Sequence, residues 1–110
     1  MSEAQLRDAE VRAAVADQRD RAAAVVRFVH DHPELAHAEH ACAAHLVAQL
    51  RDAGCEVQEG LAGMETAFRA VLRGGRPGGR VGIAVLYDAV ATVRDGGRLD
   101  AAHQSASSPV

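Results

Sequence analysis

The sequence predicts an α/β fold in which two helices pack on a small mixed sheet. Residues 81–86 form an uninterrupted apolar run, two stretches upstream carry apolar residues at helical spacing, and a glycine-rich turn precedes the run. An apolar run without polar alternation is typical of a strand that is covered on both faces. We therefore expect a central strand from Val81 to Leu86 that ends close to Asp88.

Two helices are expected before this strand. Apolar residues recur at helical spacing over residues 2–32, and Pro33 ends this helix because it disfavours helical backbone at His32 and has no N–H to donate. A second helix is predicted over residues 38–53, where one face is apolar and Gly54 follows as a stop signal.

Two shorter strands and a tail complete the expected fold. Residues 55–59 and 66–73 alternate between apolar and polar side chains, as half-buried strands do. Residues 74–79 have the glycine and proline content of a turn, so we expect the second of these strands to pair with the central strand as a hairpin. Residues 94–110 bury no apolar face, which predicts a loop or a disordered tail.

The composition is typical of one soluble globular domain. The 110 residues are 48% apolar and 25% charged, enough for a modest core, and the net charge of -3 offers no basic face for nucleic acid. No stretch has the length of a membrane span, and the first residues do not resemble a secretory signal, so we expect a cytoplasmic protein. Cys42 and Cys55 match no zinc or redox spacing and are expected to be buried small apolar residues.

Asp88 is the first candidate for chemistry because it follows the expected central strand. In open α/β sheets, ligands and catalytic groups gather beyond the carboxyl ends of the strands. An Asp after a strand also commonly closes a turn through its own backbone, and the local sequence by itself favours that role. A Ser-His-Asp hydrolase gains no support, because no serine stands in a nucleophile-elbow context.

Five of the six histidines lie in one short window, which raises the alternative of a small histidine-rich metal-binding protein. They are His30, His32, His37, His40 and His45. Two of them could share a helix face, and neutral imidazoles bind zinc or nickel. Their spacing matches no known ligand set, however, and no thiol or carboxylate is arranged as a further partner. Solvated or capping histidines are therefore the preferred interpretation.

Four segments occur in the order and spacing of a known family. They are Arg27–Leu35 followed by Glu39, Gly63–Ala70, Gly75–Gly78, and the Tyr-Asp-Ala strand end Leu86–Ala89. Together they resemble the aminoacylase-like metallopeptidase and amidohydrolase family, which includes hippurate hydrolase, aminobenzoyl-glutamate hydrolase and indole-acetyl amino acid hydrolase.

The resemblance implies a zinc-peptidase-like α/β fold, of which residues 1–93 would be a partial catalytic-type domain and residues 94–110 a tail. In such a family, zinc or manganese activates water against the amide bond of an N-acyl amino acid or a small peptide. The resemblance makes Asp88 the candidate catalytic residue, because the matching residue would hold or orient the metal centre.

The last family motif is degraded in this chain. The family has a His-x-Cys-Gly-His segment after the Tyr-Asp-Ala strand; its best match here begins at His103 and has Ser105 and Ser107 at the cysteine and second histidine positions. A neutral hydroxyl is a much poorer metal ligand than a thiolate or an imidazole. His103 remains as a metal-ligand candidate, and no tightly bound metal is expected. Family members are also longer, and their glutamate base and remaining ligands have no counterpart in this sequence.

The preferred hypothesis from the sequence is therefore a truncated and inactive member of this amidohydrolase family. The alternative is a non-catalytic interaction module that docks on a protein partner or on a full-length paralogue. Self-association is also expected, because two helices cover only part of a sheet and an unpaired strand edge attracts another strand.

Overall fold

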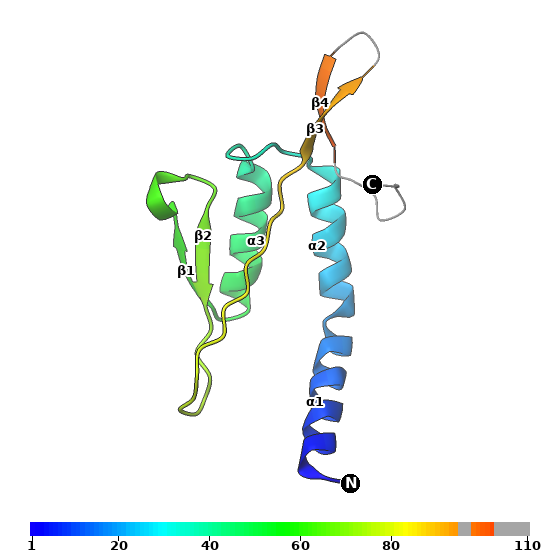
Figure 1. Cartoon of the computed structure of the whole chain (residues 1–110), viewed down its shortest axis with the longest axis vertical. Helices are drawn as coiled ribbons and strands as arrows, with labels where there is room; N and C mark the ends of the chain where they lie inside the picture. The colour runs from blue at the N-terminus through cyan, green and yellow to red at the C-terminus, as the bar shows by residue number, and fades with distance from the viewer. Residues whose placement is uncertain (95–97, 103–110) are drawn as a thin grey trace.

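Three helices form the first half of the chain in the computed structural model, which describes residues 1–94 and 98–102. They are α1 (Glu3–Asp17), α2 (Arg19–Asp31) and α3 (His40–Asp52). Figure 1 shows α1 continuing almost in line into α2, with α3 beside α2. Within the described residues, no helix combines the length and the apolar character that crossing a bilayer requires.

The helix predicted over residues 2–32 is divided in two. Gln18 leaves helical geometry, with φ -90° and ψ 1°, and its N–H closes a tighter turn on the carbonyl oxygen of Val15 at 3.1 Å. Every residue of α1 is exposed, so this helix gains little from packing. It is stabilised locally by a capping box, in which the side chains of Ser2 and Gln5 each accept the other's backbone N–H.

The core lies where α3 meets α2 and a small sheet. The apolar residues buried there, among those described, are Cys42, Ala43, Val47 and Ala89. On the side of α2, the ring of Phe28 stacks between the rings of His32 and His45, with centroid distances of 4.0 Å and 3.8 Å. This stack explains two of the clustered histidines as packing residues between the helices.

A two-stranded antiparallel sheet packs against α3. β1 (Glu56–Glu59) pairs with β2 (Phe68–Val71), with Glu56 opposite Val71, and the short 3-10 turn η1 (Leu61–Gly63) lies between them. The two predicted strands and the α/β character are confirmed, but the sheet that they form is antiparallel and not the mixed sheet expected. The expected hairpin between the second strand and residues 81–86 is wrong, because β2 pairs with β1 and residues 81–86 are not part of a described strand.

The expected central strand is also wrong. No described strand pairs with residues 81–86, termed the apolar segment below, and all six residues are exposed. The exposed fractions of Val81, Ile83 and Leu86 are 88%, 85% and 93%. Figure 1 shows the apolar segment within the yellow trace that rises from the turn after β2 to β3. An apolar run indicates that a segment tends to be buried, but it does not specify which other strands would bury it.

Residues 98–102, where a loop or tail was expected, form a strand instead. β4 (Arg98–Ala102) pairs antiparallel with β3 (Val90–Arg94), from Val90 opposite Ala102 to Arg94 opposite Arg98. The rest of the predicted tail, residues 95–97 and 103–110, lies outside the described residues.

The chain exposes far more surface than a compact protein of its size. The radius of gyration of its Cα atoms is 17.7 Å, whereas a compact chain of this length has about 13 Å. Its accessible surface of 9107 Å² exceeds by about 3,300 Å² the value expected for a compact monomer of this mass. The fold therefore leaves a large area available for contacts with another molecule.

Candidate functional site

Glu34 stands at the centre of the polar contacts in this fold. Its carboxylate accepts the backbone N–H groups of Ala41 at 3.0 Å and of Cys42 at 2.8 Å, both in the first turn of α3. The residue at the N-cap position itself, Glu39, makes no side-chain capping bond. Glu34 thus caps α3 from the preceding loop and places a negative charge at the positive end of the helix.

The ionised form of Glu34 is the stable one in this position. Partial burial raises the pKa of the carboxyl group, but the N–H donors of Ala41 and Cys42 act in the opposite direction and hold the pKa below its ordinary value. The ionised carboxylate therefore caps the first turn of α3, where each of its oxygens accepts a backbone N–H.

The backbone of Glu34 joins two segments that are far apart in the sequence. Its carbonyl oxygen accepts the N–H of Ala89 at 2.7 Å, and Leu35 forms a parallel bridge with Ala89. The Pro33-Glu34-Leu35 segment therefore lies directly against the Tyr87-Asp88-Ala89 segment. These contacts fix the point at which the chain re-enters the fold after the exposed apolar segment.

Thr66 connects the same region to the small sheet. It is 5% exposed; its hydroxyl donates to the carboxylate of Glu39 at 3.4 Å, and its carbonyl oxygen accepts the hydroxyl of Tyr87. Burial raises the pKa of Tyr87, and the nearby Glu39 carboxylate adds to this rise. Tyr87 is therefore a hydrogen-bond donor that remains protonated. We term Glu34, Glu39, Cys42, Thr66 and Tyr87 the polar junction.

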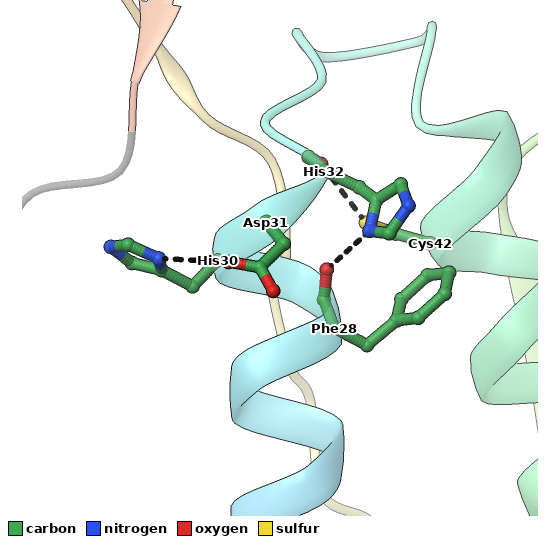
Figure 2. A network of polar contacts seen from close by, with 5 residues as sticks. All are labelled: Phe28, His30, Asp31, His32 and Cys42. Carbon is green, nitrogen blue, oxygen red and sulfur yellow. Dashed lines mark hydrogen bonds and ion pairs between the residues drawn. The ribbon is translucent and has the colours of Figure 1, made fainter.

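Cys42 is the buried thiol of the junction. It is 0% exposed, and its sulfur donates to the carbonyl oxygen of His32 at 3.3 Å, a contact drawn in Figure 2. Burial raises the pKa of the Cys42 thiol to about 12, and the hydrogen-bonded Glu34 carboxylate contributes to the same rise. The predicted burial of Cys42 is confirmed, whereas Cys55 is only half-buried. Cys42 consequently lacks the thiolate character that a nucleophile or metal ligand requires.

The clustered histidines form no metal-binding group among the described residues. Figure 2 shows the rings of His30 and His32 on opposite sides of α2. The His30 ring lies 3.6 Å from the carboxylate of Asp31, while Nδ1 of His32 donates to the carbonyl oxygen of Phe28 at 2.7 Å. Among the described residues, no group of three or more His, Cys, Asp or Glu side chains is arranged to hold a metal ion.

Asp88 lies between two residues that the junction holds in place, Tyr87 and Ala89. It is half-buried and makes no hydrogen bond or ion pair with another described residue. Its expected companions His103, Ser105 and Ser107 lie outside the described residues. The contacts of the junction had no local sequence signal, because Glu34 caps a helix that begins six residues later and does so without a capping-box motif.

Comparison with protein-family models, with curated proteins and with solved structures yields no match for this chain.

Replacing Glu34 by Gln should destabilise the fold by about 1 kcal/mol at neutral pH, because a charged cap is lost. The lowered pKa of Glu34 means that its contribution is present above the ordinary Glu pKa and disappears as the pH falls through the value in the folded chain. The difference between the two proteins should therefore shrink in acid. Urea unfolding followed by circular dichroism over a pH series measures this, and Glu65→Gln removes an equal charge from an exposed site. Equal effects of the two variants would contradict the capping role.

In the folded chain, the thiol of Cys55 should react with a disulfide-exchange dye and that of Cys42 should not. Cys42 combines 0% exposure with a raised pKa, and both properties suppress its reaction. The Cys55→Ser variant should consequently remain unlabelled until denaturant is added, while Cys42→Ser should label at the rate of the unmodified chain. Rapid labelling of folded Cys55→Ser would show that Cys42 is accessible.

Proposed function

We propose that this chain acts as a non-catalytic interaction module that associates through its apolar segment. The observation that carries the proposal is the exposure of large apolar side chains over residues 81–86. Besides the three residues given above, Val85 is 67% exposed. Soluble monomers rarely present a contiguous apolar patch of this kind unless it serves an interaction.

The energetics favour association. Burying a Val, Ile or Leu side chain contributes about 1.5–3 kcal/mol, so four such side chains offer a substantial part of the free energy that association requires. A standard protein interface takes about 800 Å² from each partner, which is well within the excess surface of this chain. The unpaired backbone of the apolar segment adds hydrogen-bonding groups that a partner strand can satisfy.

The resemblance to the amidohydrolase family supports a related origin for this architecture. In the proposal, the chain corresponds to the first part of a zinc-peptidase-like catalytic domain and resides in the cytoplasm, where its two free thiols stay reduced. Its partner is a protein and not an N-acyl amino acid. Two acidic residues of the motif segments, Glu34 and Glu39, act as acceptors in structural hydrogen bonds, which supports a structural use of these motifs.

Association should weaken strongly when the apolar segment receives a charge. Ile83→Lys buries a cation in any interface formed by this segment and removes an apolar contact, so the concentration at half-association should rise at least about tenfold. Light scattering after size exclusion over a concentration series measures this. Val26→Lys is the matched control, since Val26 is an apolar residue of α2 that is 66% exposed. Equal effects of the two variants, or a chain that stays monomeric at every concentration and also binds no other protein, would refute the proposal.

Hydrolysis of hippurate or acetyl-amino acids should be undetectable with the chain loaded with zinc or manganese. Ser105 and Ser107 are poor ligands, and the described residues contain no metal-binding group. Release of the free amino acid is the measurement, with Asp88→Asn as the comparison. Metal-dependent turnover that disappears in Asp88→Asn would show that the chain is an enzyme.

A further inference from the structure

The geometry points to a second copy of this chain as the partner, paired antiparallel through residues 80–88 about a two-fold axis at Ala84. This inference rests on the proposed function, which it deepens by naming the occupant and the register. Three observations carry it: the charges at the two ends of the segment, the distribution of its side chains, and the backbone edge that is free.

The end charges are self-complementary. Arg80 and Asp88 are the charged residues that flank the uncharged stretch 81–87, and both lie four positions from Ala84. In an antiparallel pair centred on Ala84, Arg80 of each copy lies opposite Asp88 of the other. Each dimer thereby gains two opposite-charge cross-strand pairs, whereas a shift of one residue loses both.

The same register brings apolar side chains together. Ile83 lies opposite Val85, so β-branched side chains from both copies share one face. Val81 lies opposite Tyr87, whose hydroxyl stays on the carbonyl oxygen of Thr66 and whose ring lies against that of Phe68. On the other face, Gly82 lies opposite Leu86, so the largest apolar side chain of that face has space beside a residue that has no side chain. Val81, Ile83 and Val85 thus share one face of the strand pair, and Leu86 lies on the other face.

The free edge is defined by the polar junction. The N–H of Ala89 already donates to the carbonyl oxygen of Glu34, so the backbone groups of odd-numbered residues face that edge of an extended strand. In the proposed strand pair, where residues 81–88 are extended, residues 82, 84, 86 and 88 direct their N–H and C=O groups to the opposite edge. A two-fold axis at Ala84 makes these same residues the hydrogen-bonded ones, so the dimer leaves the contact between Ala89 and Glu34 intact.

The available area agrees with such a dimer. The chain exposes about 3,300 Å² beyond a compact monomer, and about 800 Å² from each copy suffices for a stable interface. A two-stranded ribbon alone is marginal in water, so further surface of each copy has to be covered as well.

A charge-swap cycle on the full chain tests the register. Arg80→Asp and Asp88→Arg each place like charges opposite one another twice in the dimer, so each should raise the dimer dissociation constant at least about fivefold. The double variant restores both pairs in reversed order and should return the constant to within about twofold of the unmodified chain. Sedimentation equilibrium provides the constants, and circular dichroism confirms folding.

Cross-linking gives a second, independent readout. In a Cys55→Ser background, Ala84→Cys places two thiols opposite each other with Cα atoms about 5.5 Å apart, within disulfide range. Leu86→Cys is the matched control, because the two copies of residue 86 are about 14 Å apart along the strands. Oxidation should yield a covalent dimer of the first variant and not of the second.

The possible results distinguish a wrong dimer register from a wrong proposed function. A dimer that Ile83→Lys dissociates, but in which the double charge variant fails to recover or Leu86→Cys cross-links as well as Ala84→Cys, would overturn the pairing about Ala84 and leave association through the apolar segment standing. A chain that binds another protein but never a second copy of itself would likewise overturn the dimer and leave association through the apolar segment standing. A monomer without any partner would overturn both.

Discussion

The double use of Glu34 is the constraint on which the rest of the structure depends. Its carboxylate caps the first turn of α3, and its carbonyl oxygen holds Ala89. The first contact sets where α3 begins relative to α2, and the second sets where the chain returns after a long exposed excursion. Because a single residue makes both contacts, the position of α3 and the position of residues 87–89 cannot change independently.

Polar contacts have this importance because the apolar core is small. The buried apolar side chains among the described residues are small or medium in size, while larger ones such as Ile83 and Leu86 lie in solvent. A buried thiol, a threonine and a tyrosine hydroxyl complete the contacts around the capped helix end. Hydrogen bonds to a charged group contribute more than neutral ones, so the carboxylate compensates in part for the modest apolar burial.

Local signals in the sequence predicted the elements whose determinants are local. α3 was predicted from its apolar face and from Gly54, whose φ of 92° suits a glycine after a helix. β1 and β2 were predicted from the alternation of apolar and polar side chains. The break at Gln18 and the exposure of residues 81–86 did not follow, because they depend on what packs against each segment. Within the candidate site, Asp88 was singled out by its position after an apolar run. The capping role of Glu34 was not found, since it joins residues seven and eight apart by tertiary contact.

The failure of the central-strand prediction also bears on the proposed association. The apolar run retains the β-branched composition of an interior strand, yet the described residues offer it one anchored end and no neighbouring strand. An apolar surface alone would attract many partners in many orientations. Anchoring Ala89 on Glu34 occupies one edge at one end, and in the proposed dimer Arg80 and Asp88 of the two copies would pair in a single register. In the proposed association, the junction that orders the interior would therefore also restrict how the exposed segment pairs, so one contact would serve both selectivity and stability.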